Sequence, residues 1–251
     1  MQGSSLEGST LSQPYAEIEL RERLWGVLMT PVSSFAAVLN REGWRDWCIP
    51  VLVVCLVMMG GNYLTLSVVA DVETPAVRQQ LQDMSELQRQ QFVQYMEIYR
   101  AHGWVTMPLV GQFFFLALVG LVLLIFARFL FNGDMSLRQA LIVKAYASLV
   151  MVPEAIVRTG LILVLGKASV YTGLGILVTD GMAATFWGKV LIGVNFFDLW
   201  QVWVVSIGLH VLADVPFKRT VVVLGVFWGM WIVGGAAVEV AGNIIELAPP
   251  S

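Results

Sequence analysis

Long apolar segments dominate the pattern along the chain. A helix needs roughly 20 consecutive apolar residues to cross about 30 Å of hydrocarbon. Segments 49–69, 104–127 and 220–238 meet or nearly meet this requirement without any charged residue. Segment 197–214 is shorter and bounded by acidic residues, and segment 140–165 qualifies by length and hydropathy despite its charges. The sequence therefore predicts five transmembrane helices.

The segments outside these spans also have helical patterns. Residues 1–48 form an N-terminal tail, in which charged residues alternate with Leu24, Trp25 and Phe35. This pattern favours a helix lying in the membrane interface, and the alternative is a connector without membrane contact. A short tail, 241–251, follows the membrane domain 49–240.

Two connecting segments are expected to carry helices of their own. Residues 74–103 have apolar residues at helical intervals, a start signal at Thr74–Pro75 and a stop signal at Gly103. They predict an outer amphipathic helix or helical hairpin, which serves as a lid or docks a partner. Loop 166–196 is too apolar to be fully solvated, so a short re-entrant or interfacial helix is expected there.

The amino-acid composition indicates that most of the protein surface contacts lipid rather than water. Of 251 residues, 57% are hydrophobic and 13% charged, whereas about a quarter of the residues of a soluble protein are charged. The predicted fold class is therefore an all-α integral membrane protein, a bundle of five transmembrane helices in contact with the lipid bilayer. A net charge of −3 without a basic cluster argues against nucleic acid as a partner.

The positions of Lys and Arg predict the orientation. With the N-terminus inside, nine of these residues lie in inner segments and five in outer segments. Positive charge concentrates on the cytoplasmic side of membrane proteins. The N-terminus is therefore expected in the cytoplasm and the C-terminus outside.

The third span carries the most unusual residues. On a helical wheel, Lys144, Ser148, Glu154 and Arg158 fall on one stripe, and Pro153 lies on the other side. Membrane helices direct charge into the bundle interior, so this helix is expected to be central. Pro153 leaves a carbonyl without its helical partner and should kink the helix.

Charges of other spans suggest partners for this stripe. Arg158 is expected to pair with Asp198 or Glu239 near the outer boundary, because all three lie at similar depth. Lys144 is expected to pair with Asp214 near the inner boundary. Glu154 is left without a partner beyond its own helix. The candidate polar intramembrane cluster comprises Lys144, Ser148, Glu154, Arg158, Asp198, His210, Asp214 and Glu239.

Catalytic motifs are missing from the sequence. No HExxH, GxSxG or Walker pattern occurs, and Cys48 and Cys55 resemble small apolar side chains rather than metal ligands. His210 and Asp214 share a helix face and could form a proton relay, but a buried, hydrogen-bonded histidine is the simpler interpretation. We therefore expect no enzyme activity, cofactor or metal site.

Small residues in the fifth span suggest close helix packing. Gly225 and Gly229 form a GxxxG pattern, which brings helix backbones together in membranes. The contact is either intramolecular or part of a homodimer, and the sequence does not decide between them.

Three segments resemble a known family. "RLWGVLMTPVSSFAAVLNREGWRDWCIPVLV" resembles the entry segment of bacterial Yip-type (Ypt-interacting protein domain) membrane proteins. "FNGDMSLRQALIVKAYASLVMVP" is similar to their loop and third span, and "NFFDLWQVWVVSIGLHVLADVPFKRTVVVLGVFWGMWIV" to their fourth and fifth spans. The resemblance implies five spans and a cytoplasmic N-terminus. Eukaryotic members bind Rab GTPases through a long N-terminal part, which this chain lacks.

Two functions follow as hypotheses. The first is a non-enzymatic, multi-pass inner-membrane protein of the Yip type, a scaffold or accessory subunit that contacts another membrane protein or a second copy of itself. The alternative is a small transporter or channel with a polar path along the third and fourth spans. A cavity that reaches Glu154 would favour transport, whereas a dry, paired Glu154 would exclude it.

Overall fold

The computed structural model describes residues 19–38, 43–69, 81 and 84–247. Within these residues the chain is built from helices, and the one β-type contact is an isolated bridge between Gly173 and Asn195. Five helices are long and apolar enough to cross a membrane. The predictions of an all-α fold and of five apolar helices of spanning length are confirmed.

The helices of spanning length lie close to the predicted segments. The first span is α3 (Arg45–Val69), and the second is α6 (Trp104–Ile125). The third consists of α7 (Leu137–Ala147) and α8 (Met151–Leu165). The fourth is α11 (Phe196–Ala213), and the fifth is α12 (Phe217–Leu247), which extends beyond the predicted end at 238.

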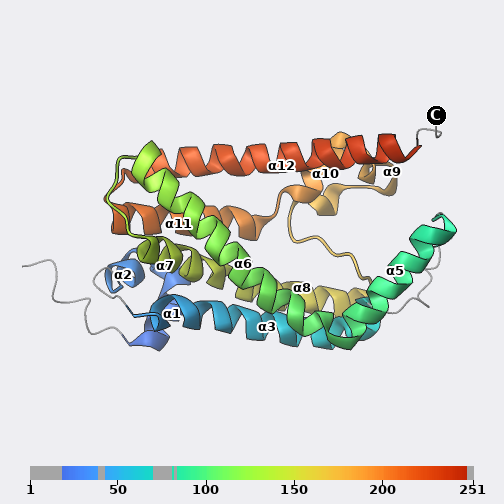
Figure 1. Ribbon diagram of the computed structural model, residues 1–251, viewed down its shortest axis with the longest axis horizontal. Helices are drawn as coiled ribbons and strands as arrows, with labels where there is room; N and C mark the ends of the chain where they lie inside the picture. Colours follow the sequence, from blue (N-terminus) through green and yellow to red (C-terminus); the bar gives the residue numbers. More distant parts are fainter. Residues whose placement is uncertain (1–18, 39–42, 70–80, 82–83, 248–251) are drawn as a thin grey trace, which may run out of the picture.

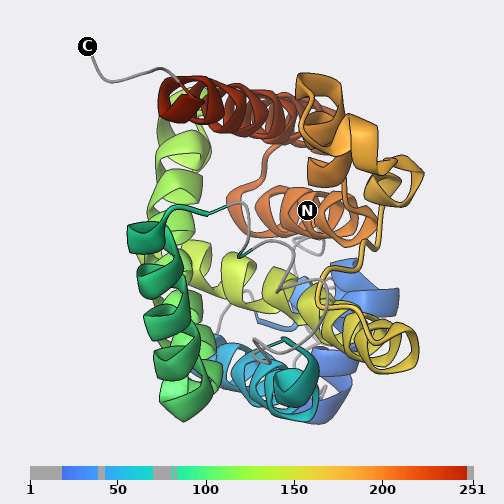
Figure 2. The same ribbon diagram turned by 90° about the vertical axis from the view of Figure 1, so that its right-hand side faces the viewer.

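The spans run in the same general direction, with shorter helices gathered at both ends of the bundle. In Figure 1, α12 lies at the top and α3 at the bottom, and α6 crosses the bundle diagonally. Figure 2 again places α12 and α3 on opposite sides of the bundle. Helices α1 (Leu20–Met29) and α2 (Pro31–Ala36) lie at the left end of Figure 1. We call this the α1 end, and the opposite end, which carries α5, the α5 end.

The third span is interrupted near its middle. A 3₁₀ turn, Ser148–Val150, separates α7 from α8, and Pro153 follows in the first turn of α8. Because proline has no N–H, it cannot bond the carbonyl of Leu149 as a helix requires. The third span is therefore two helices joined by an irregular turn.

The core lies around α7 at the α1 end. Ile142, Val143 and Tyr146 are completely buried, together with neighbours from α1, α2 and α11. By contrast, Ile156 and Val164 of α8 are largely exposed. The expected central position is thus found for the α7 half of the span, whereas the α8 half lies at the edge of the bundle.

One face of the N-terminal helices α1 and α2 is buried in the bundle. Val27 and Phe35 are completely buried, and the Phe35 ring lies 6.1 Å from the Tyr146 ring. The opposite face of α1 exposes Trp25 and Met29. The interfacial position of this segment stays a prediction, but one face of it belongs to the protein core.

The outer insert is continuous with the second span. Helix α5 (Glu86–Ile98) begins at the capping residue Ser85 and passes through a π-helical turn, Tyr99–Gly103, into α6. The prediction that Gly103 ends the helix is wrong. Its φ is −62°, and a side chain there would meet the Tyr99 ring at 2.8 Å, so the glycine makes room for Tyr99 within the helix. The expected start at Thr74–Pro75 lies outside the described residues.

The apolar loop after α8 contains helical pieces. A 3₁₀ turn, Leu174–Leu177, is followed by α9 (Asp180–Ala183) and α10 (Phe186–Gly193). A side chain at Gly193 would lie 3.0 Å from Ile232, so α10 packs closely on α12. Its position relative to the membrane stays a prediction.

Candidate functional site

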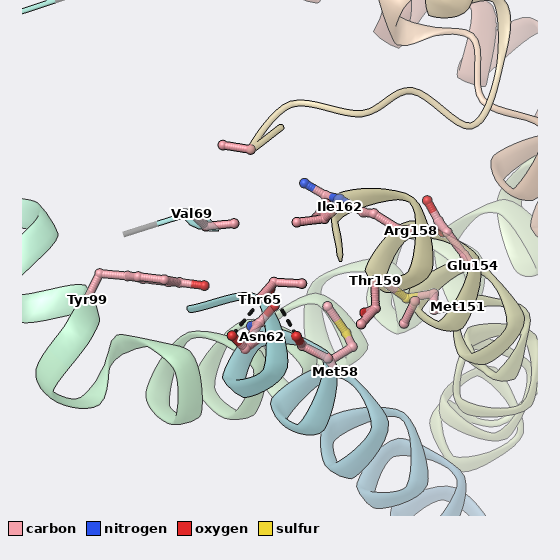
Figure 3. A pocket seen from close by; sticks show the side chains of 13 residues that line it. Met58, Asn62, Thr65, Val69, Tyr99, Met151, Glu154, Arg158, Thr159 and Ile162 are labelled. Atoms are coloured by element: carbon pink, nitrogen blue, oxygen red, sulfur yellow. Dashed lines mark hydrogen bonds between the residues drawn. The ribbon is translucent and has the colours of Figure 1, made fainter. Parts of the chain in front are cut away.

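A polar cavity lies between α3 and α8 in the half of the bundle nearer the α5 end. Its volume is about 160 Å³. Polar and charged side chains of three helical segments line it, and Figure 3 shows them around the space: Asn62 and Thr65 from α3, Tyr99 from the π turn, and Glu154, Arg158 and Thr159 from α8. The cavity therefore reaches Glu154.

A close approach of two helices forms the base of the cavity. A side chain at Gly61 would meet the Thr159 hydroxyl at 2.5 Å, so glycine lets α3 lie this near α8 without displacing the Thr159 side chain. Met58 and Met151 also line the cavity, and the Gln112 amide of α6 lies 3.3 and 3.5 Å from their sulfur atoms. Two thioethers thus line the cavity, and the Gln112 amide contacts both of them.

Glu154 is held by an amide rather than by a cation. Asn195 Nδ2 donates to Glu154 Oε1 at 2.6 Å. The Asn195 side-chain oxygen also accepts from the backbone N–H of Phe197, the first-turn contact that caps α11. The Glu154 carboxylate is therefore connected to the start of the fourth span by a neutral amide.

Arg158 does not make the predicted ion pair. Glu239 pairs instead with Lys189 of α10, because α12 and α10 lie together on the other side of the bundle. Asp198 interacts electrostatically with Lys144. Among the described residues Arg158 has no ion pair, and its exposed side chain reaches the cavity.

Lys144 is buried and held by Gln201. Its Nζ donates to Gln201 Oε1 at 3.3 Å, and Gln201 Nε2 donates to the Ala147 carbonyl at 3.2 Å, beside the break in the third span. The prediction that Lys144 pairs with Asp214 is wrong. Asp214 follows α11, 13 residues beyond Gln201, or about 20 Å along the helix axis.

The remaining cluster members have structural contacts. Ser148 Oγ donates to the Lys144 carbonyl at 2.8 Å, one turn back on the same helix. His210 Nδ1 lies 2.8 Å from the Val215 carbonyl oxygen. The histidine is thus hydrogen-bonded to the backbone at the α1 end, but its side chain is exposed, so the expectation that it is buried is wrong.

The GxxxG glycines make no close contact within the described chain. A side chain at Gly225 or Gly229 would meet no atom within 4 Å. Close intramolecular packing at these two positions is therefore not found, and the homodimer alternative stays a prediction.

Neutral polar residues complete the site and were missed. Asn62, Tyr99, Asn195 and Gln201 hold or border the charged groups, whereas the predicted cluster consists mainly of charged residues. Asn195, Asp198 and Gln201 follow one another at intervals of three, which places them on one helix face. That spacing is the signal that could have identified two of them.

Comparison with known proteins adds no relative. No protein-family model, curated protein or solved structure matches the chain. The Yip-type resemblance therefore stays a prediction. Among the described residues, no group of three or more His, Cys, Asp or Glu side chains is arranged to hold a metal ion.

Replacing Gln201 should reveal how much it stabilises the bundle. Gln201→Leu leaves Lys144 Nζ and the Ala147 carbonyl without this partner, and a buried polar group without one costs about 1–3 kcal/mol. We expect the free energy of unfolding to fall by about 2 kcal/mol, measured by unfolding in mixed detergent micelles. Gln94→Leu on the exposed face of α5 is the control. An equally small loss of unfolding free energy in both variants would show that the two hydrogen bonds of Gln201 do not stabilise the bundle.

Proposed function

We propose that the protein is a non-enzymatic, multi-pass membrane protein that binds a small polar solute between α3 and α8 and transports it. The observation that supports this proposal most is the position of Glu154. It lies in the cavity wall, and its hydrogen bond comes from neutral Asn195 rather than from a cation. A dry Glu154 in an ion pair would have indicated a structural role.

The surroundings of the cavity fit a transport role. Charged residues inside spans are costly in lipid and mark ion or substrate pathways. Transporters also bind substrates where a transmembrane helix is interrupted. Here Met151 and Glu154, just beyond the 3₁₀ turn Ser148–Val150, line the cavity.

The packed core near α7 separates the cavity from the α1 end. Tyr146, Val150 and Val204 are at most 1% exposed. A solute that enters at the α5 end therefore stops in the cavity. Passage across the membrane requires this core to open, and the turn between α7 and α8 is the irregular point of the third span.

The orientation belongs to the same proposal. The excess of Lys and Arg in the segments at the α1 end supports a cytoplasmic α1 end and an external α5 end. The cavity would then face the outside of a cell inner membrane.

A Yip-type scaffold or accessory subunit is the second proposal. It is supported by α12, whose outer half contacts α10 but leaves Trp231 79% and Val238 74% exposed. Another membrane protein or a second copy could pack there. Copurification of a reproducible partner would support it.

Cysteine labelling tests the transport proposal. In a chain with Cys48 and Cys55 replaced by serine and alanine, Asn62→Cys and Thr159→Cys each place a thiol in the cavity wall. We expect a membrane-impermeant thiol reagent added to intact cells to label both, because water from outside reaches the cavity.

Two control variants define the absence of labelling and complete labelling. Val54→Cys, completely buried on α3, should not react, and Arg100→Cys, exposed at the α5 end, should react fully. Labelling only after permeabilisation would show the opposite orientation. If the cavity cysteines do not react under either condition while Arg100→Cys does, solute entry is contradicted.

A further inference from the structure

We propose that the cavity between α3 and α8 binds a small zwitterion, with its ammonium group at Glu154 and its carboxylate or phosphate group at Arg158. This inference rests on the proposed solute binding and adds the chemical class of the solute. It follows from the charges, the neutral polar groups and the size of the cavity.

The first argument is that two opposite charges line one cavity without forming an ion pair. Glu154 and Arg158 are four residues apart on α8, and both line the cavity. No ion pair joins them, although each contributes to the electrostatic field at the other. A single ligand with both charges would compensate both side chains.

The second argument concerns the negative end of the ligand. Figure 3 shows Tyr99 reaching toward the cavity from the side opposite α8, where Arg158 and Glu154 lie. A guanidinium presents several donors in a fork that matches the oxygen atoms of a carboxylate or phosphate. The Tyr99 hydroxyl and the Asn62 amide can add neutral donors.

The third argument concerns the positive end. An ammonium group has three donors and no acceptor, so it requires oxygen atoms. Glu154 Oε1 is occupied by Asn195 Nδ2, and the carboxylate has further lone pairs to accept an ammonium proton. Met58 and Met151 line the core side with polarizable thioethers, which suit the methylene groups between the charges.

Cavity size limits the ligand. A cavity of about 150 Å³ in another protein holds one benzene molecule, and this cavity has about 160 Å³. A compound with about six to eight non-hydrogen atoms therefore matches this volume. Free amino acids and the phosphoethanolamine headgroup of a lipid share this size and charge pattern.

Binding measurements on the full chain test the proposal. The protein is placed in nanodiscs of phosphatidylglycerol, whose headgroup has no ammonium group, and titrated calorimetrically with O-phosphoethanolamine, β-alanine, ethylamine and inorganic phosphate. Each charged hydrogen bond contributes about 1.5–3 kcal/mol, so we expect the better zwitterion to bind about tenfold more tightly than ethylamine or phosphate.

Two substitutions test which side chain binds the positive end of the ligand and which binds the negative end. Glu154→Gln should weaken zwitterion binding about tenfold without weakening phosphate binding, whereas Arg158→Gln should weaken both. The matched controls Glu97→Gln and Arg100→Gln remove the same charges from exposed positions at the α5 end, outside the cavity, and should change nothing.

A second nanodisc distinguishes the two sources of the ligand. If added phosphatidylethanolamine lowers the apparent affinity for free O-phosphoethanolamine, the occupant is a lipid headgroup, and if it has no effect, the occupant is a free solute. Either result supports a zwitterion site. Zwitterions that bind no more tightly than ethylamine or phosphate would overturn it, and continued labelling of Asn62→Cys would show that solute entry itself still holds.

Discussion

Asp46→Asn is expected to cost about 3–5 kcal/mol of the free energy of unfolding, because it breaks a buried ion pair. Arg23 Nη1 donates to Asp46 Oδ1 at 3.0 Å, and the two side chains are only 4% and 11% exposed. Asparagine keeps the size of the side chain but removes its charge. The guanidinium of Arg23 would then stay buried without compensation.

Unfolding of the full chain in mixed detergent micelles measures this loss. Glu22→Gln on the exposed face of α1 removes an equal charge and should change the free energy of unfolding by less than about 0.5 kcal/mol. Replacing both partners, Arg23→Met with Asp46→Leu, should recover most of the stability, since apolar residues can substitute for a buried pair. A loss for Asp46→Asn as small as that for Glu22→Gln would show that the pair does not hold α1 to α3.

Phe35→Ala should destabilise the protein by about 3–5 kcal/mol, the usual cost of removing a buried phenylalanine. Phe35 is completely buried between α7 and α11. Its ring contacts Tyr146, and a side chain at Gly208 would meet its Cζ atom at 3.0 Å. Alanine leaves a cavity there that neighbouring side chains cannot fill.

The matched control for this substitution lies on the same short helix. Val32 is 55% exposed, so Val32→Ala should have little effect on the same unfolding curve. Because Phe35 belongs to α2, its loss should also make α1–α2 more accessible to limited proteolysis. Unchanged proteolysis and unchanged stability together would show that the N-terminal helices do not depend on this contact.

Spanning helices could be predicted because lipid imposes length and apolarity on every such segment. Segment 197–214 differs from α11 by one residue at each end. Gly103 misled the prediction since glycine ends helices in water, whereas here it accommodates the Tyr99 ring inside a continuous helix. The burial of Phe35 depends on tertiary contacts with α7 and α11, which the pattern of one segment does not contain.

Charged partners were harder to predict than the charged residues themselves. Wheel positions and estimated depth place Lys144 and Arg158 along their helix but do not show which residue of another helix lies opposite. The fourth span does lie beside α7, but Lys144 meets Gln201 rather than Asp214, which lies about 20 Å further along the same helix, so here the level along the neighbouring helix was wrong. The structure places α12 beside α10, so Glu239 meets Lys189 rather than Arg158. The missing information was the level of α11 relative to Lys144 and the identity of the helix beside α12.

Asn195 gives the site a thermodynamic link to the fourth span. The same amide caps α11 through its oxygen and holds Glu154 through its nitrogen. A cation or ammonium group that competes with Asn195 for Glu154 therefore acts on the stability of the first turn of α11. Linkage is reciprocal, so whatever loosens that first turn changes the affinity at Glu154 by the same factor. A ligand that displaces Asn195 from Glu154 would thus couple occupancy of the cavity to order at the start of the fourth span.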